Sequence, residues 1–348
     1  MSIVSTAVTT ARGVVMRGLF GLPAHVVERL AGSPVVIDGR RLHPEMQLLL
    51  KLQKLEGPPA ETVSISRGRR IIAAQSQLAG GTQPIGAVTG RSIDGPGGRL
   101  PLRFYTPRGL TGTSPALVFF HGGGWIYGDL ESHDALCRVL AEQAQVRVVA
   151  VDYRLAPEAP FPAAVEDAMA AWTWVADHAH ALGIDPERIA VGGDSAGGNL
   201  AAIVAQQTVR AGLASPAFQL LIYPATDFAE RAPSRTTYRE GFYLTKDFMD
   251  LAEETYLVGG EDRADPRLSP LYGDVSGVAP AYVVTAGFDP LLDEGNAYAA
   301  ALKSAGVEVE HLCEDGLIHG FANMVAVGRE APQAVRRMSA ALRRGLAR

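Results

Sequence analysis

The sequence predicts an α/β protein with a mostly parallel central sheet that is covered by helices on both faces. Short, fully apolar runs alternate with longer helical patterns from about residue 85 onward. Apolar runs of this kind are typical of strands buried on both faces, and their alternation with helices is typical of a parallel sheet. Before the first run, the stretches 85–92 and 100–107 flank a glycine-rich turn at 94–98, which predicts an antiparallel hairpin at one edge of the sheet.

The remaining elements follow in order along the chain. A helix is expected over 44–54, where a proline stands near the start and leucines recur at helical spacing. The apolar runs predict six strands, at 116–120, 146–151, 188–193, 218–223, 281–286 and 307–312. Helical patterns between them predict helices over 163–182 and 196–211. We therefore expect one main domain over 85–348.

Two segments, 1–60 and about 225–265, do not fit the alternation of strands and helices. Both carry scattered apolar residues, which are Leu19, Phe20, Leu48, Leu49, Leu50, Phe242, Tyr243, Leu244 and Phe248. If all of them faced water, they would form a large exposed apolar patch, which soluble monomers avoid. We expect the two segments to pack together as an N-terminal cap segment and a cap insertion, over the carboxyl edge of the sheet, where α/β folds bind ligands.

The overall composition excludes several classes of protein. The chain has 348 residues and a formal net charge of −5, so it lacks the basic excess typical of a nucleic-acid-binding surface. Its two cysteines, Cys137 and Cys313, lie far apart, which excludes a disulfide framework and disfavours a cysteine-based zinc site. We favour two free thiols over a single bridge between them. Free thiols are typical of a reducing compartment, and we expect a cytoplasmic location.

The N-terminal stretch bears on membrane association. No apolar run approaches the ~20 residues needed to span a bilayer, so we expect no transmembrane segment. Arg12 and Arg17 interrupt the first apolar stretch, which disfavours a cleaved signal peptide. The pattern of Val14, Val15, Leu19 and Phe20 predicts an amphipathic helix. Its apolar face is expected on the protein's own core or, as the alternative, on a membrane surface.

A G-x-S-x-G motif lies between an expected strand and an expected helix, at Gly193-Asp194-Ser195-Ala196-Gly197. In that context a sharp turn holds the serine hydroxyl out at the top of the sheet, and the small flanking residues let neighbouring backbone approach. The N-terminal N–H groups of the helix point toward the same place. We interpret Ser195 as a nucleophile; a glycine-rich β–α turn without chemistry is the alternative.

A glycine-rich segment follows the expected strand 116–120, at His121-Gly122-Gly123-Gly124-Trp125. Consecutive glycines leave backbone N–H groups accessible to an oxyanion that forms beside the serine. A phosphate-binding loop is excluded because neither Gly-Lys-Ser/Thr nor G-x-G-x-x-G is formed here. We expect His121 to anchor the loop. We assign Trp125 and Tyr127 to the wall of a substrate pocket, with plain packing as the alternative.

A serine nucleophile needs a histidine base and a carboxylate that orients it. Where a serine nucleophile lies on a strand–turn–helix of this kind, the acid and then the histidine follow it along the chain. Only two of the eight histidines, His311 and His319, are then candidates for the base. His311 falls inside an expected strand, whereas His319 lies in the loop after it, so we select His319. Asp289 lies just beyond the preceding strand and is the best-placed acid. Asp293 at the start of the next helix and Asp227 after an earlier strand are the alternatives.

Together, the motifs resemble those of the hormone-sensitive-lipase-like family of α/β-hydrolases, over about residues 85–330. Asp194, directly before the candidate nucleophile, is similar to the bacterial Gly-Asp-Ser-Ala-Gly branch. Residues 1–35 match nothing in the family's common pattern. The motifs that carry the resemblance are His121-Gly-Gly-Gly-Trp125, Asp152-Tyr-Arg-Leu-Ala-Pro-Glu158, Gly193-Asp-Ser-Ala-Gly-Gly198, Asp289-Pro-Leu291 and His319-Gly-Phe321.

The resemblance implies an α/β-hydrolase fold with a helical cap, and a carboxylesterase for short- to medium-chain acyl esters that needs no cofactor and no metal. It implies Ser195 as the nucleophile, His319 as the base and Asp289 as the orienting acid. The implied donors to the oxyanion are the N–H groups of Gly123, Gly124 and Ala196.

The segment 152–158 is implied to be structural and to support the site through Arg154 and Glu158. The expected partner is a small-molecule acyl ester and not a nucleic acid, and the sequence leaves a homodimer open. Two other functions also stay open. The same machinery can cleave an amide or peptide bond, although the sequence shows no sign of a propeller domain or of a charged pocket for a peptide terminus. The fold can also serve as a small-ligand receptor, but the presence of all three triad candidates disfavours a non-enzyme.

Overall fold

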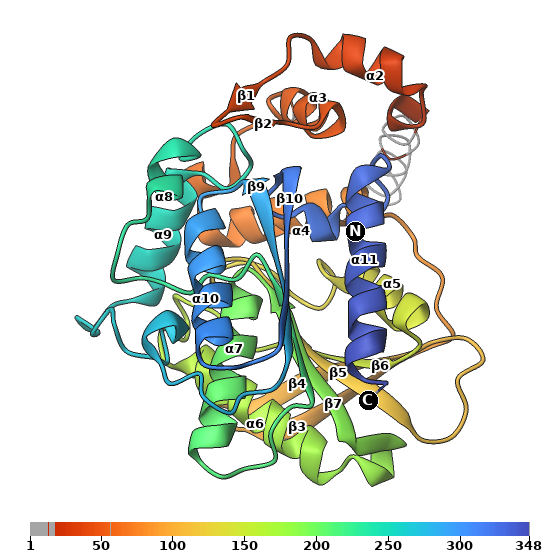
Figure 1. Cartoon of the computed structure of the whole chain (residues 1–348), viewed down its shortest axis with the longest axis vertical. Coiled ribbons are helices and arrows are strands. Elements are labelled where there is room, and N and C mark those ends of the chain that lie inside the picture. Colours follow the sequence, from red (N-terminus) through yellow and green to blue (C-terminus); the bar gives the residue numbers. More distant parts are fainter. Residues whose placement is uncertain (1–12, 14–17, 56, 348) are drawn as a thin grey trace.

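The computed structural model describes residue 13 and residues 18–55 and 57–347. These residues form one eight-stranded sheet and a small two-stranded sheet. The order of strands in the large sheet is β10-β9-β8-β7-β5-β6-β4-β3, and helices cover both of its faces (Figure 1). The prediction of an α/β fold with a mostly parallel, helix-covered sheet is confirmed.

The strands of the large sheet are β3 (Ala87–Gly95), β4 (Gly98–Thr106), β5 (Ser114–Phe120), β6 (Arg147–Val151), β7 (Ile184–Asp194), β8 (Phe218–Ile222), β9 (Ala281–Phe288) and β10 (Val309–Ile318). β3 and β4 form the predicted antiparallel hairpin at one edge. Among the six strands β5 to β10, every pair of neighbours in the sheet is parallel. The carboxyl ends of these parallel strands therefore meet at one edge of the sheet.

The helices are α2 (Ala24–Ala31), α3 (Pro44–Gln53), α4 (Ile65–Gly80), α5 (Asp134–Ala144), α6 (Ala163–Asp177), α7 (Ala196–Arg210), α8 (Pro233–Thr237), α9 (Lys246–Tyr256), α10 (Leu292–Ser304) and α11 (Glu330–Gly345). Short 3-10 turns are η1 (Ala60–Thr62), η2 (His180–Leu182), η3 (Pro270–Tyr272) and η4 (Phe321–Asn323). The small sheet pairs β1 (Val36–Ile37) with β2 (Arg40–Arg41).

Strand β5 shows why the predicted strands are apolar throughout. Val118 and Phe120 belong to the apolar core that also contains residues of α6 and α7. Leu117 and Phe119 belong to the core on the opposite face, with residues of α5 and α11. Successive side chains point to opposite faces of a strand, so a strand with helices on both sides needs apolar residues at every position.

Several element boundaries differ from the prediction; for example, β7 begins at Ile184 and not at residue 188. β10 continues past its predicted end to Ile318, with a shift in register between Glu314 and Ile318, because backbone pairing with β9 does not require apolar side chains. His319 therefore follows directly after a strand and does not lie within a longer loop. The helix α6 ends at Asp177, and the turn η2 with Gly183, at a φ of +66°, completes the predicted helical stretch.

The segments that were expected to form a cap lie beyond the carboxyl ends of the parallel strands. In Figure 1, α2, α3 and α4 lie across this end of the molecule, with α8 and α9 on one side of the view. α2 packs against α3, and α3 packs against β10. Phe20 is buried in the same apolar cluster as Leu48 and Leu50, so its partner is the protein's own core. Val14 and Val15 lie outside the described residues.

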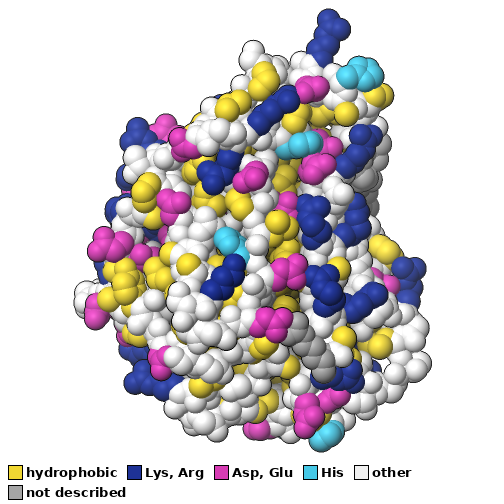
Figure 2. Space-filling model, in the orientation of Figure 1, with side chains coloured by type: hydrophobic (Ala, Val, Ile, Leu, Met, Phe, Trp, Pro, Cys, Tyr) yellow, Lys and Arg dark blue, Asp and Glu magenta, His cyan; other side chains and the backbone are white. Residues whose placement is uncertain are grey.

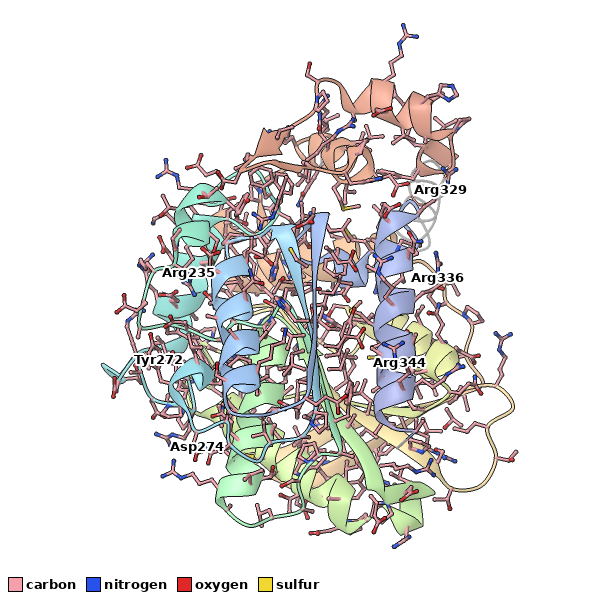
Figure 3. All side chains as sticks on the ribbon, in the orientation of Figure 1. Arg235, Tyr272, Asp274, Arg329, Arg336 and Arg344 are labelled. Atoms are coloured by element: carbon pink, nitrogen blue, oxygen red, sulfur yellow. The ribbon has the colours of Figure 1, made fainter. Side chains whose placement is uncertain are left out.

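A buried ion cluster joins α8 to the helices on either side of it. The Arg235 guanidinium, labelled in Figure 3, lies 2.8 Å from Glu253 Oε1 on α9 and 2.9 Å from Glu294 Oε2 on α10. The three side chains are at most 9% exposed. Burial raises the pKa of Glu294, and the guanidinium opposes that rise. The segment 225–265 is therefore fixed to the main domain by paired charges as well as by apolar contacts.

Three further features are the distribution of charge on the surface, the state of the two cysteines and the character of the helices. Figure 2 shows Lys and Arg side chains interspersed with Asp and Glu over the face in view. Cys137 and Cys313 are both free thiols, and Cys137 is buried, so the interpretation as two free thiols is confirmed. Within the part of the chain that the structure describes, no helix has both the length and the apolar character needed to cross a bilayer.

Candidate active site

The turn that carries Ser195 is shaped by the two glycines of its motif. β7 ends just before Ser195 and α7 begins just after it, so this residue alone forms the turn, at a φ of +56°. A β-carbon on Gly193 would lie 2.4 Å from the backbone of Gly197, and one on Gly197 would lie 1.9 Å from the Phe120 oxygen. A positive φ is strained at a serine, and it persists only where the surroundings hold it. Here the Ser195 N–H donates to the Ile222 oxygen at 2.9 Å.

The register of the sheet brings a histidine and an aspartate to the same place. β9 and β10 are neighbouring parallel strands, and Phe288 is paired with Ile318 at their carboxyl ends. The residues that follow these two, Asp289 and His319, therefore lie side by side. Asp289 Oδ2 lies 2.7 Å from His319 Nδ1, and His319 Nε2 lies 2.9 Å from Ser195 Oγ.

The surroundings of Asp289 decide what this chain of contacts can do. The carboxylate is fully buried and also accepts a hydrogen bond from the Leu291 N–H at 2.8 Å. An ionised carboxylate beside Nδ1 keeps a proton on that nitrogen, so Nε2 presents its lone pair to the Ser195 hydroxyl. The Tyr223 ring packs against the imidazole of His319, with the ring centroids 4.5 Å apart. The arrangement can take the serine proton as Oγ attacks a carbonyl carbon.

The other candidates for the acid and for the histidine base form hydrogen bonds elsewhere in the structure. Asp293 lies in the first turn of α10 and accepts a hydrogen bond from the Ser234 N–H at 2.8 Å. The Asp227 carboxylate accepts from the backbone of Ala229 at 2.8 Å and of the next residue at 3.0 Å. His311 lies inside β10, with its Nε2 3.4 Å from the hydroxyl of a threonine on β9. The structure therefore brings only Asp289, of the three acids considered, into contact with the histidine that reaches Ser195.

The glycine loop after β5 lies along the same cavity as Ser195. Gly123 and Gly124 have φ values of +125° and +63°, which glycine adopts without strain. Among the described residues, the N–H groups of Gly123, Gly124 and Ala196 donate no hydrogen bond. These three donors are therefore free to bind an oxygen atom beside Ser195.

A model of the α/β-hydrolase fold family matches residues 117–323, which include the glycine loop, Ser195 and both of its partners. The chain belongs to the α/β-hydrolase fold family. The resemblance to the hormone-sensitive-lipase-like family, drawn from the motifs, is confirmed.

Relatives of this α/β hydrolase bear names of ester hydrolases. It is 45% identical over 327 residues to carboxylic ester hydrolase LipN of Mycobacterium tuberculosis, a match that covers 91% of this chain and 87% of that protein. It is also 45% identical to ethyl acetate hydrolase of Pseudomonas putida, over 68% of this chain and 76% of that protein. Among solved structures, the ester hydrolase EH1AB1 from the metagenome of Lake Arreo is 39% identical, with a TM-score of 0.86 over 88% of this chain and 100% of that one.

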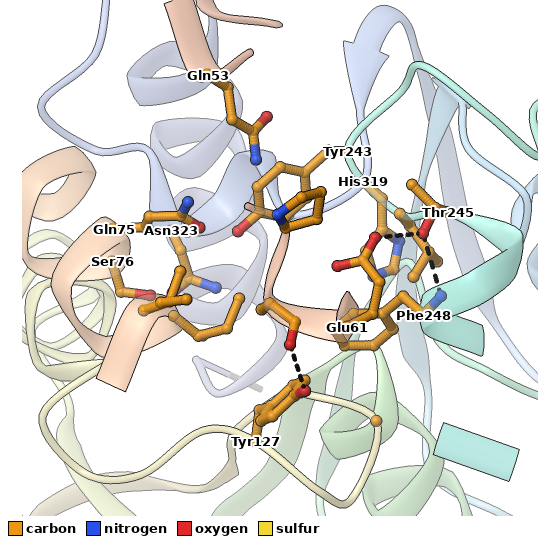
Figure 4. A pocket seen from close by; sticks show the side chains of 18 of the residues that line it. Gln53, Glu61, Gln75, Ser76, Tyr127, Tyr243, Thr245, Phe248, His319 and Asn323 are labelled. Carbon is orange, nitrogen blue, oxygen red and sulfur yellow. Dashed lines mark hydrogen bonds between the residues drawn. The ribbon is translucent and has the colours of Figure 1, made fainter. Parts of the chain in front are cut away.

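A cavity of about 640 Å³ lies in front of Ser195 and His319 in this α/β hydrolase (Figure 4). One side of its wall comes from the glycine loop and from the turn after His319. The other side comes from α3, from η1 and α4, and from the residues 241–248 that lead into α9. The wall therefore includes residues 61–78, beyond the end of the N-terminal cap segment that the sequence suggested.

The two aromatic residues assigned to the pocket wall differ in position. Tyr127 lines the cavity, and its hydroxyl donates to the Ala60 oxygen at 3.1 Å. Trp125 does not line it: the indole is buried and stacks on the Tyr256 ring, with centroids 4.8 Å apart and planes within 7°. The assignment of Trp125 to the pocket is therefore wrong, and the packing alternative holds. The Phe228 ring also packs on this indole, with the centroids 5.3 Å apart.

A buried polar network behind the glycine loop was not foreseen from the sequence. The Asp194 carboxylate accepts from the Gly122 N–H at 2.9 Å and from Asn323 Nδ2 at 3.1 Å, and it lies 3.1 Å from His133 Nε2. Burial raises the pKa of this carboxyl, but His133 and the Gly122 N–H more than offset that effect and hold the pKa below its usual value. Asp194 thus remains an anion that holds the first glycine of the loop. No local motif marks His133, because its partner lies 61 positions further along the chain.

His121 anchors the loop from within. Its Nδ1 lies 2.9 Å from the Gly122 oxygen, and its ring stacks on Tyr153 with centroids 4.2 Å apart. Burial, with the nearby His133, lowers the pKa of His121 to about 4. His121 is therefore neutral at neutral pH, which agrees with the expectation that it anchors the loop.

The segment 152–158 contacts the glycine loop and its neighbourhood through Tyr153 and, by way of Arg69, through Glu158, whereas Arg154 pairs with α6. The Tyr153 hydroxyl donates to the His121 oxygen at 2.6 Å, and Arg154 pairs with Asp167 of α6 at 2.8 Å. Glu158 pairs with Arg69 on α4 at 2.7 Å. Arg69 also donates to the oxygen atoms of residues 126 and 156, both at 2.9 Å. The segment thus links α4 to the glycine loop.

Proposed function

We propose that this protein hydrolyses short- to medium-chain acyl esters through an acyl-enzyme on Ser195. The chain is a carboxylic ester hydrolase of the α/β-hydrolase fold. The observation that supports an acyl-enzyme on Ser195 is a chain of two contacts. His319 Nε2 lies 2.9 Å from Ser195 Oγ, and His319 Nδ1 lies 2.7 Å from Asp289 Oδ2.

The proposed reaction has two acyl-transfer steps. In the first, Ser195 Oγ attacks the ester carbonyl carbon while His319 Nε2 takes its proton, and the N–H groups of Gly123, Gly124 and Ala196 bind the oxyanion. His319 then gives the proton to the departing alcohol. In the second step, a water molecule deprotonated by His319 attacks the acyl carbon and releases the acid, and the proton returns to Ser195. Asp289 keeps the imidazole in the required tautomer and stabilises its charged form.

The cavity supports the proposed range of chain lengths. Apolar side chains of α3, α4 and α9 contribute to its wall, among them Leu50, Ile71, Ile72 and Phe248. A space of about 640 Å³ accommodates a small or medium-sized ligand. We assign the segments that form this side of the wall as a cap, because they keep water from the reacting carbonyl and limit the length of the acyl chain.

A series of p-nitrophenyl esters tests the substrate class. We expect kcat/KM to be highest between the butanoate and the octanoate and to fall for the tetradecanoate, whose chain is long for a cavity of about 640 Å³. The matching butanoyl p-nitroanilide should react far more slowly. Equal rates on the anilide, or a maximum at the longest chain, would contradict the proposal.

A further inference from the structure

The wall of the cavity contains a carboxylate that the proposed reaction does not use. Glu61 on η1 lines the same cavity as Ser195 and His319 (Figure 4). Apolar residues on each side of it, such as Ile71 and Leu244, suit an acyl chain but leave a charged group unexplained. Glu61 is partly buried, so its carboxylate is open to a molecule that enters the cavity.

Contacts with Tyr127, which follows the glycine loop, fix the position of η1 and therefore of Glu61. The neighbouring Ala60 oxygen accepts a hydrogen bond from the Tyr127 hydroxyl at 3.1 Å. The Tyr127 N–H donates to the Gly123 oxygen at 2.9 Å. The Phe248 ring packs on the Tyr127 ring, with centroids 5.5 Å apart. Glu61 is thereby held in the wall of the cavity that also contains Ser195 and His319.

Among the residues that the structure describes, only one of the two carboxylate oxygens of Glu61 has a partner. The Glu61 Oε1 accepts a hydrogen bond from the Thr245 hydroxyl at 2.8 Å, and this hydroxyl in turn accepts from the Phe248 N–H at the start of α9. Among the described residues, Oε2 takes part in no hydrogen bond or ion pair, and in Figure 4 it points away from Thr245 into the cavity. The basic residues of the lining, Lys54 and Arg67, are exposed and do not pair with it.

The charge of Glu61 acts on its surroundings. Burial raises the pKa of Tyr243 to about 12, and the carboxylates of Asp194 and, to a smaller extent, Glu61 add to that effect. Tyr243 also lines the cavity, and its ring lies against Gly320, the residue after the proposed base. Glu61 and Tyr243 therefore both lie on the wall of the space in which a substrate would lie.

We propose that Glu61 makes this esterase select substrates that carry an ammonium group or a similar hydrogen-bond donor on the acyl or the alcohol part. This inference rests on the proposed ester hydrolysis. The free Oε2 accepts a charge-assisted hydrogen bond from the donor, while Oε1 stays fixed by Thr245. A substrate with a carboxylate at the same place meets a like charge and is disfavoured.

Two pairs of esters of equal shape test the proposal. On the acyl side, methyl 6-aminohexanoate replaces the terminal methyl group of methyl heptanoate by an ammonium. On the alcohol side, 6-aminohexyl butanoate replaces the terminal methyl group of heptyl butanoate by an ammonium. The readout is the ratio of kcat/KM for the cationic ester to that for its neutral counterpart.

We expect Glu61→Gln to lower this ratio about tenfold in at least one pair, since a hydrogen bond to a charged group contributes enough for such a factor. Glutamine keeps an oxygen for the Thr245 hydroxyl, so the substitution removes the charge and retains that contact. The matched control is Glu254→Gln, which removes one charge from the exposed face of α9, outside the cavity. It should leave the ratio unchanged.

The outcomes separate the role of Glu61 from the proposed function. An unchanged ratio in both pairs would overturn the proposal. So would an equal loss of activity on all four esters together with a lower Tm, which would make Glu61 only a link between η1 and α9. A wild-type enzyme that hydrolyses none of the four esters would instead contradict the proposed function and, with it, the role of Glu61.

Discussion

The proposed triad and the cavity wall above it are held by different kinds of contact. Asp289 and His319 each follow the end of a strand, and the register of β9 and β10 brings them together. The wall joins elements that lie far apart in the sequence through individual side chains, such as Glu61 with Thr245, 184 positions apart. Changes at the edge of the sheet should therefore affect the chemistry. Changes in the wall should affect stability and substrate preference.

The largest expected effect lies at the edge of the sheet. Asp289→Asn should lower kcat by about 10⁴-fold, because an amide favours the wrong tautomer of His319 while the geometry is kept. Asp293→Asn is the matched control: it changes the same residue type four positions on, in the first turn of α10. Steady-state kinetics on p-nitrophenyl butanoate checks both. A larger loss for Asp293→Asn would move the acid to α10.

The next effect concerns the stability of the wall. Arg235→Met should lower the free energy of unfolding by about 3–5 kcal/mol, because it leaves Glu253 and Glu294 buried without their shared cation. The control is Arg231→Met, at a side chain that is 62% exposed and lies 3.9–4.0 Å from its partners. Arg231→Met should lower the free energy of unfolding by less than about 1 kcal/mol. Urea unfolding measures both, and equal losses would show that burial of the cluster contributes nothing.

A smaller effect should appear in the pH dependence of stability. The pKa of His121 is lowered to about 4 in the folded protein, against about 6.5 in an unfolded chain. Between these values the unfolded chain binds a proton that the folded one does not, so stability falls as the pH falls. The free energy of unfolding should drop by about 2 kcal/mol more in the wild type than in His121→Phe between pH 6.5 and 4.5. Parallel pH profiles for the two proteins would mean that His121 does not titrate in this way.

The smallest effect is expected at the N-terminal end. The described residues before Leu50 do not line the cavity, but α2 packs against α3, which does. Deletion of residues 1–35 should raise KM for butanoate to octanoate esters a few-fold or broaden the chain-length preference. A small organophosphate should still react with Ser195. If KM, chain-length profile and Tm all stay at wild-type values, this segment plays no part in the cap.

Local features made much of the fold predictable from the sequence. Apolar runs located the strands β5 to β10, and a glycine-rich turn located the hairpin of β3 and β4. The G-x-S-x-G motif located Ser195, because a strand–turn–helix of that shape accepts only glycine at residues 193 and 197. Asp289 and His319 were predicted because each follows the carboxyl end of an expected strand, at the edge of the sheet where Ser195 also lies. β10 was predicted too short because its last residues, through Ile318, are paired by the backbone and not by an apolar pattern.

Long-range contacts could not be predicted in this way. His133 meets Asp194 in the folded chain only, and neither residue's surroundings in the sequence show the partner. The part played by α4 in the cavity wall was missed because Arg69 fixes that helix to residues 126, 156 and 158, outside any local pattern. Trp125 was assigned to the pocket from its place in the loop, whereas its stacking on Tyr256 depends on where α9 packs.

The most direct test of the account is the site of covalent labelling by a fluorophosphonate. Such a reagent reacts with a serine only where a base activates the hydroxyl and an oxyanion site receives the phosphoryl oxygen. We predict that the wild-type protein takes up one label, that peptide mass spectrometry places it on Ser195, and that Ser195→Ala takes up none. A label on another residue, or equal labelling of Ser195→Ala, would contradict the assignment of Ser195, His319 and Asp289.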